Sequence, residues 1–105
     1  MGERTPDVRP GDIGVTITRL ASVIRQRHEE LPEGSYTAKL LAAGPDAALK
    51  KLGEETVELA LAVKDGDHDH IRYEAADIVY HLLVALEHAG VGVEELAGEL
   101  DARGV

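Results

Sequence analysis

Apolar side chains recur at helical spacing through most of this chain. Near its start, Ile13, Ile17, Leu20 and Ile24 follow one another at intervals of three or four residues, which places them on one face of an α-helix. Comparable stripes are separated by Gly and Pro, which commonly end and begin helices. The pattern predicts an all-α protein with four main helices and one short helix, over about residues 14–30, 36–43, 45–64, 70–89 and 94–103.

The helix expected over residues 45–64 differs from the others because it is apolar on more than one side. Its main stripe consists of Leu49, Leu52, Thr56, Leu59, Ala60 and Val63. Two further apolar residues, Val57 and Leu61, lie beside a separate acidic arc. A helix that is apolar on several sides is usually buried. We therefore expect this helix at the centre of the bundle.

The length of 105 residues allows one domain with a modest core. Residues 1–12, which are polar and contain Pro6 and Pro10, are expected to form a flexible N-terminal arm. Residues 13–105 are expected to form a single helical domain. Because so short a chain buries only about two-thirds of its unfolded surface, we expect a second copy of the chain to complete the bundle.

The charge and the residue types exclude several classes of protein. A net charge of −9 argues against a nucleic-acid-binding surface, although a phosphorylated small molecule remains compatible when a cation bridges it to acidic side chains. The chain has no cysteine, which removes disulfides and thiolate metal sites. It shows no apolar run of membrane-spanning length and no signal-peptide core. We expect a cytoplasmic protein that binds neither nucleic acid nor membranes.

Two spaced pairs of acids carry the candidate chemistry. Glu55 and Glu58 are three residues apart on one predicted helix, and Glu74 and Asp77 are three residues apart on the next, so each pair shares a helix face. A short connection turns the two helices antiparallel, and the pairs then face each other. Carboxylate oxygens are ligands that suit Mg²⁺, and Mn²⁺ is the alternative cation.

Other interpretations of the same residues stay open. An acidic helix face is most often simply solvated. His70 and His81 share a stripe with Glu74 and Asp77 and would suit a Zn²⁺ site; we expect instead a surface position for His70 and a contact between His81 and a metal ligand.

Several segments together resemble the phosphoribosyl-ATP pyrophosphohydrolase family, of the all-α pyrophosphatase superfamily that includes MazG and the dimeric dUTPases. The resemblance covers roughly residues 20–103. It rests on Ser35-Tyr36-Thr37-Ala38-Lys39-Leu40-Leu41, Gly44-Pro45-Asp46, Lys50-Lys51-Leu52-Gly53-Glu54-Glu55 with Glu58, Lys64-Asp65-Gly66-Asp67, and Glu74-Ala75-Ala76-Asp77-Ile78 with Tyr80-His81-Leu82-Leu83-Val84.

The resemblance implies a MazG-like helical bundle that dimerises and uses Mg²⁺ to hydrolyse phosphoribosyl-ATP to phosphoribosyl-AMP and pyrophosphate, at the second step of histidine biosynthesis. It implies that Glu55, Glu58, Glu74 and Asp77 hold the metal. Glu54 also matches the family motif, and Glu54 and Glu55 are the candidate catalytic residues; our hypothesis is that Glu54 positions or deprotonates the attacking water, or supports a metal ligand. The residues implied to contact substrate are Ser35, Tyr36, Lys39, Lys50 and Lys51.

Some of these residues have a structural alternative to a role in the site. Ser35 and Thr37 would serve as helix caps, Tyr36 would pack in the core, and Lys51 would pair with Glu55 one turn away. At the level of function, the alternatives are a MazG-like enzyme that clears aberrant nucleoside triphosphates and a non-catalytic helical dimerisation module.

Overall fold

The computed structural model describes residues 5 and 7–104. It contains the helices α1 (Ile13–Glu30), α2 (Tyr36–Ala42), α3 (Pro45–Asp65), α4 (His68–Ala89) and α5 (Val93–Ala102). The all-α prediction, with four longer helices and one short one, is confirmed for these residues. Residues 1–4 and 6 of the predicted arm, and the last residue of the predicted domain, lie outside the described residues.

The helix ends follow from local chemistry. Asp12 and Ser35 cap α1 and α2, because their side chains accept hydrogen bonds from the backbone N–H groups of Val15 and Ala38. α4 begins two residues earlier than expected because Asp67, rather than a later aspartate, is its cap and accepts from the N–H of His70 at 3.2 Å. Gly66 ends α3 with a φ of 74°, a conformation that glycine adopts without strain.

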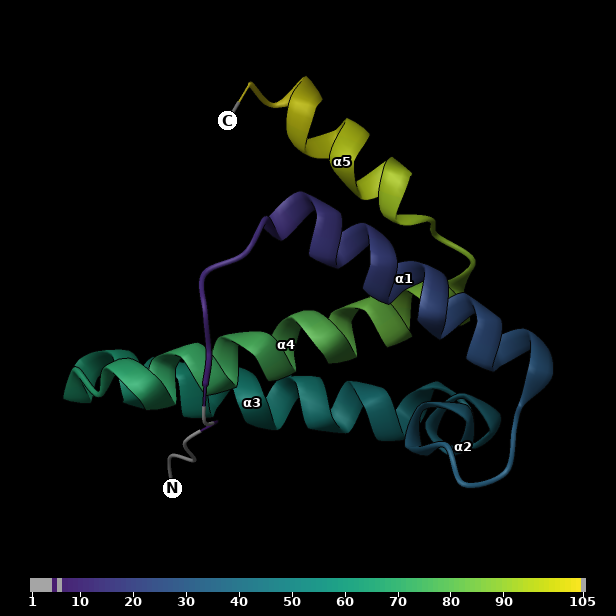
Figure 1. Ribbon diagram of the computed structural model, residues 1–105, viewed down its shortest axis with the longest axis horizontal. Coiled ribbons are helices and arrows are strands. Elements are labelled where there is room, and N and C mark those ends of the chain that lie inside the picture. Colours follow the sequence, from purple (N-terminus) through teal and green to yellow (C-terminus); the bar gives the residue numbers. More distant parts are fainter. Residues whose placement is uncertain (1–4, 6, 105) are drawn as a thin grey trace.

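The centre of the fold is the antiparallel pair α3 and α4, which lie side by side along most of their length (Figure 1). α1 crosses one side of α4, and α2 packs at the end of the pair where α3 begins. Ile24, Leu40, Leu41, Ala48, Leu83 and Val84 form the buried apolar core between these elements. The core thus lies where α1 and α2 meet the α3–α4 pair.

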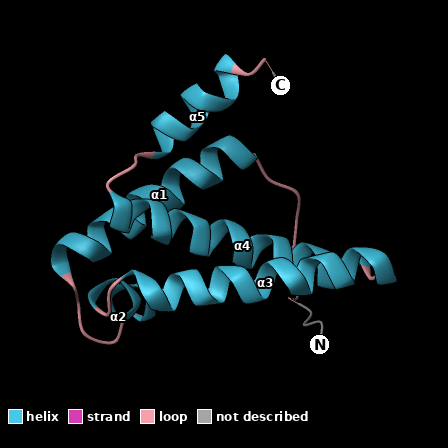
Figure 2. Ribbon diagram, turned by 180° about the vertical axis from the view of Figure 1, so that it is seen from behind, coloured by secondary structure: helices cyan, strands magenta, loops and turns pink. Residues whose placement is uncertain are grey.

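α5 stands apart from this body. Figure 2 shows it from behind as a separate arm above α1, and none of its residues is buried. Its first residue, Val93, packs against the core cluster. Among the described residues, no single helix combines the length and the apolarity needed to span a membrane; α4 and α5 meet those criteria only taken together, as a pair bent by 106°.

The expected central position of α3 is confirmed on one side, where α3 packs along α4, but its other side is uncovered in a single chain. Leu49, Val57, Leu61 and Val63 are 50–60% exposed, because α4 covers only one side of α3 and α1 packs on α4. The fully buried residues of α3 are instead the small Ala48 and Ala62. The main apolar stripe of α3 is therefore only partly covered in this chain, with Leu52 and Leu59 half-buried and Leu49 and Val63 exposed.

Candidate metal centre between α3 and α4

The face that α3 turns toward α4 carries Ala48, Glu55 and Ala62, at intervals of seven residues. Both alanines are 0% exposed, and the Glu55 side chain is 13% exposed. Residues spaced by seven stay on one side of a helix that packs nearly parallel or antiparallel to a partner. The alanines have short side chains, so they let α4 approach closely and enclose the Glu55 carboxylate between the helices.

The face that α4 turns toward α3 carries a polar stripe. Glu74 and His81, also seven residues apart, are 7% and 5% exposed and are the buried polar residues of the described chain. Asp77 lies between them on the same helix, with intermediate burial. The acidic and imidazole stripe of α4 is thus buried against α3, and a merely solvated acidic face does not describe it.

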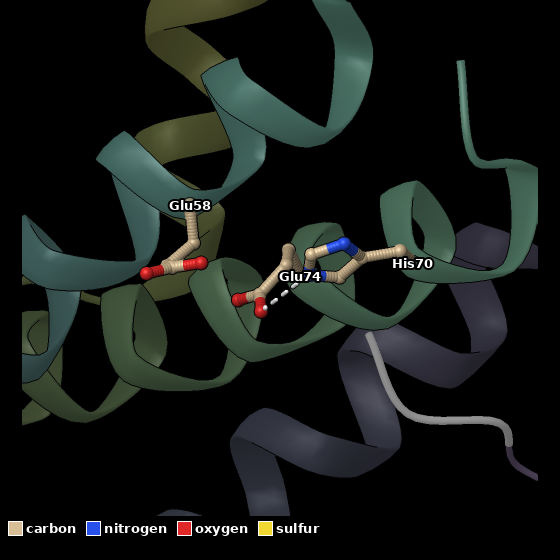
Figure 3. A group of neighbouring side chains, drawn as sticks. All are labelled: Glu58, His70 and Glu74. Carbon is tan, nitrogen blue, oxygen red and sulfur yellow. Dashed lines mark hydrogen bonds and ion pairs between the residues drawn. The ribbon is translucent and has the colours of Figure 1, made fainter. Parts of the chain in front are cut away.

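Glu58, His70 and Glu74 form one group whose ligand atoms all lie within 4.8 Å of one another. Figure 3 shows the Glu58 carboxylate from α3 and the Glu74 carboxylate from α4 turned toward the same space. His70 Nε2 lies 3.2 Å from Glu74 Oε2, and the side chain of His70 is only 13% exposed. The expected surface position of His70 is therefore wrong, since the cap at Asp67 starts α4 early enough to place it one turn before Glu74.

Glu55 and His81 form the shortest polar contact of the site. His81 Nδ1 lies 2.6 Å from Glu55 Oε1 and 3.1 Å from the backbone carbonyl of Asp77. Burial raises the pKa of Glu55 above its usual value; the His81 hydrogen bond acts in the opposite direction, and the charges of Asp77 and Glu74 raise it further. The expected contact between His81 and one of the four acids is confirmed.

These contacts bring the two acidic pairs together. Glu55 lies within electrostatic reach of Asp77 and Glu74, and Glu58 lies beside Glu74. Among the described residues, no Lys or Arg forms an ion pair with any of the four acids. Facing carboxylates without a cationic side chain repel one another, and carboxylate oxygens are ligands that Mg²⁺ and Mn²⁺ accept. The donor set therefore fits a divalent cation.

Three other candidate residues on α3 lie outside this buried group. Glu54, Lys50 and Lys51 are exposed, and Glu54 makes no hydrogen bond or ion pair with another described residue. Glu55 pairs with His81 and not with Lys51, so the alternative of a Lys51–Glu55 pair finds no support. All three side chains are free to meet a molecule bound over the acids.

The α2 candidates surround a shallow hollow of about 460 Å³. Ser35, Tyr36 and Lys39 line it together with the turn from Leu31 to Gly34. The capping alternative for Ser35 is correct, whereas Tyr36 is 54% exposed and is not a core residue.

The alternative role of Thr37 as a helix cap is wrong. Its hydroxyl forms a hydrogen bond of 2.5 Å with the Tyr80 hydroxyl. Tyr80 belongs to α4, one turn after Asp77 and next to His81. This bond joins the segment that lines the hollow to the helix that carries Glu74 and Asp77.

The sequence placed His70 on the stripe of Glu74, four residues away, but did not show that its ring is enclosed beside that carboxylate. An imidazole at that spacing can reach the carboxylate of the next turn. Spacing alone could not decide between a solvated ring and an enclosed one, because that depends on how closely α3 covers the first turn of α4.

Comparison with known proteins identifies the family. The family model for phosphoribosyl-ATP pyrophosphohydrolase matches residues 17–104. A protein named phosphoribosyl-ATP pyrophosphatase from Rhizobium rhizogenes is 47% identical over 90 residues, covering 86% of this chain and 86% of its own. Its namesakes from Methylobacterium nodulans and Halobacterium salinarum are 50% and 51% identical, covering 84% and 83% of this chain and 82% and 95% of their own. The chain therefore belongs to the phosphoribosyl-ATP pyrophosphohydrolase family.

Proposed function

We propose that this protein hydrolyses phosphoribosyl-ATP to phosphoribosyl-AMP and pyrophosphate, the second step of histidine biosynthesis, with Mg²⁺ as its cation. One water is consumed, and the anhydride bond between the α- and β-phosphates is broken. The observation that carries the proposal is the pairing of acids from α3 and α4 without a Lys or Arg partner among the described residues. Support for the substrate comes from the names of relatives that align over most of the chain.

Glu55, Glu58, Glu74 and Asp77 would hold the cation. When bound, Mg²⁺ neutralises phosphate oxygens, aligns the triphosphate and lowers the pKa of a bound water. Mn²⁺ is the second candidate, because His70 adds an imidazole nitrogen beside Glu74 and imidazole favours transition metals over Mg²⁺. The residues present thus supply the negative charge that a cation needs between an acidic protein and an anionic substrate.

We assign the attacking water to Glu54 and Glu55. Glu54 is exposed and unpaired among the described residues, so its carboxylate can accept a proton from a water above the acids. Glu55 contributes by adjoining Glu54 while holding the cation. The remaining task of the protein is to position the substrate and the water in line.

The substrate contacts are assigned to two exposed groups. Lys50 and Lys51 precede the acids on α3 and are exposed, so their ammonium groups are available to phosphate oxygens. Ser35, Tyr36 and Lys39 border the hollow at α2. The Ser35 hydroxyl oxygen already accepts a bond from Ala38 N–H, and its own hydrogen remains available to a substrate oxygen.

We also propose that the functional unit is a homodimer. The exposed apolar residues of α3, which include Val57 and Leu61, form a surface that a second copy would cover, since large exposed apolar patches usually mark interfaces. Sedimentation equilibrium would test this, and a mass of a single chain at micromolar concentration would reject it.

A nucleotide panel tests the proposed reaction. The purified protein, with millimolar Mg²⁺, is given phosphoribosyl-ATP, ATP, dCTP or dUTP, and pyrophosphate release is measured. We expect turnover of phosphoribosyl-ATP, loss of turnover in Glu55→Gln and Asp77→Asn, and normal turnover in the control Glu29→Gln, whose side chain is exposed on α1. Turnover of the deoxynucleotides alone would indicate the MazG-like alternative, and no release from any nucleotide would indicate a non-catalytic module.

A further inference from the structure

His81 is buried at the middle of the α3–α4 pair, on the helix that supplies two of the four acids. Its side chain is 6% exposed and contacts Glu55 from α3 and the backbone of Asp77 from α4. We propose that His81 is a positioning residue, which fixes the Glu55 carboxylate through Nδ1–H so that the remaining oxygen, Oε2, is the one available to a cation. The inference rests on the proposed function, because it assumes that Glu55 is a metal ligand.

The two contacts of Nδ1 determine which ring nitrogen carries the proton. A backbone carbonyl can only accept a hydrogen bond, and the Asp77 carbonyl lies 3.1 Å from Nδ1. An unprotonated Nδ1 would direct its lone pair at that oxygen and at Glu55 Oε1, 2.6 Å away. A hydrogen on Nδ1 serves both acceptors, so the ring donates from Nδ1.

The surroundings hold the ring in this orientation. The Tyr80 ring meets the His81 ring edge to face, with centroids 4.9 Å apart. Nε2 is buried and has no hydrogen-bond partner among the described residues. A ring flipped by 180° would put the carbon Cδ2 in the place of Nδ1 and would lose both contacts. The bond to Asp77, on the same helix one turn earlier, adds a local reason to keep Nδ1 where it is.

The geometry of an imidazole suits this task. Held by its bond to the Asp77 carbonyl, the ring directs Nδ1 at Oε1 of Glu55 and leaves Oε2 open. Groups that orient metal ligands in this way typically change metal affinity or activity by about 10–100-fold when they are replaced.

The first test uses the unmodified protein and needs no variant to fold. Long-range ¹H–¹⁵N correlation spectra of the metal-free protein report which nitrogen of His81 bears hydrogen. We expect a protonated Nδ1. An unprotonated Nδ1, with the hydrogen on Nε2 alone, would overturn the proposal, because His81 could then not donate to Glu55.

The second test separates positioning from packing by a matched pair of variants. The amide nitrogen of Asn can take the place of Nδ1, whereas the longer Gln side chain places its amide near the position of Nε2. Mn²⁺ affinity is measured by electron paramagnetic resonance for the wild type, His81→Asn and His81→Gln. We expect a loss of about 10–100-fold in His81→Gln and near-wild-type affinity in His81→Asn. Equal losses in both variants, or no loss in either, would overturn the proposal.

Failure of this inference differs from failure of the proposed function. If the wild type binds Mn²⁺ and Glu55→Gln weakens it, the metal site stands and the His81 variants alone decide the inference. If the wild type binds no Mn²⁺, the proposed site itself is wrong and the inference falls with it. Thermal unfolding of both metal-free variants, followed by circular dichroism, checks that each is folded before affinities are compared.

Discussion

At the scale of single residues, the most consequential side chain is the carboxylate of Glu55. It lies between two helices. Burial and the charges of Asp77 and Glu74 disfavour its ionised form, whereas the hydrogen bond from His81 favours it. Such a group lowers the stability of the metal-free protein. Under the proposed function, a bound cation would offset this local cost.

The raised pKa of Glu55 predicts a pH-dependent effect of Glu55→Gln. As pH rises above 4.5, Glu55 ionises first in the unfolded chain, while the folded protein still holds the proton. Folding then becomes less favourable with increasing pH through the window that begins at the ordinary value and ends at the raised one. We expect Glu55→Gln, without metal, to melt higher than the wild type at pH 7.5, and the gain to shrink at pH 4.

Melting curves in the presence of a chelator, recorded at both pH values, check this prediction. Gln can still accept the His81 hydrogen bond through its amide oxygen, so the comparison isolates the charge. The control Glu29→Gln removes an exposed carboxylate of α1 and should change the melting temperature little at either pH. A lower melting temperature for Glu55→Gln at pH 7.5 would contradict the account.

At the scale of elements, the pairing of α3 with α4 depends on small residues. Ala48 and Ala62 are both fully buried on the face that α3 turns to α4, and they lie seven residues before and after Glu55. Larger side chains there would push the helices apart, and with them the acids that face each other. The main apolar stripe of α3, in contrast, is only partly covered: Leu49 and Val63 are exposed.

We predict that Ala48→Leu destabilises the protein, whereas the neighbouring Ala47→Leu does not. Ala48 is 0% exposed, and added methyl and methylene groups in a well-packed core typically cost about 1–3 kcal/mol. Ala47 is exposed, and leucine is a good helix former. Urea unfolding of both variants gives the comparison. Equal stability of the two variants would show that the α3–α4 interface tolerates bulk at this position.

At the scale of the whole molecule, the chain by itself is incompletely covered. Apolar residues of α1 and α3 are exposed, among them Ile13 at 73% and Val57 at 60%, and α5 packs only weakly on the rest. The buried polar stripe, in contrast, is enclosed within one chain by α3 and α4. The proposed dimer would thus complete the apolar surface, while Glu58 already lies beside Glu74, and Glu55 near Glu74 and Asp77, inside a single subunit.

A bound cation should stabilise the whole fold. Ligands that bind only the folded state raise the free energy of unfolding by about 2.7 kcal/mol at a concentration 100 times their dissociation constant. We therefore expect the melting temperature to rise with millimolar Mg²⁺. Asp77→Asn, which removes one of the four carboxylates, should lose most of that rise. A melting temperature that stays flat across millimolar Mg²⁺ would contradict a preformed site.

The sequence alone determined the helices and the spacing of the acids. Helix ends follow from local groups such as the Ser35 cap and Gly66, and the separation of Glu74 from Asp77 places both on one face whatever the rest of the chain does. The motifs also sufficed to indicate the family, which the comparisons establish. These properties depend on neighbours within one or two turns, so they can be inferred without knowing the fold.

The tertiary structure decided which faces meet. Helical periodicity sorts residues onto faces but does not say which face packs most closely; on α3 it is the face of Ala48 and Ala62, which are fully buried, and the main apolar stripe is only partly covered. The same choice buried Glu55 against His81 and enclosed His70 beside Glu74. Contacts between side chains on different helices depend on that approach, and for this reason only the folded chain could supply them.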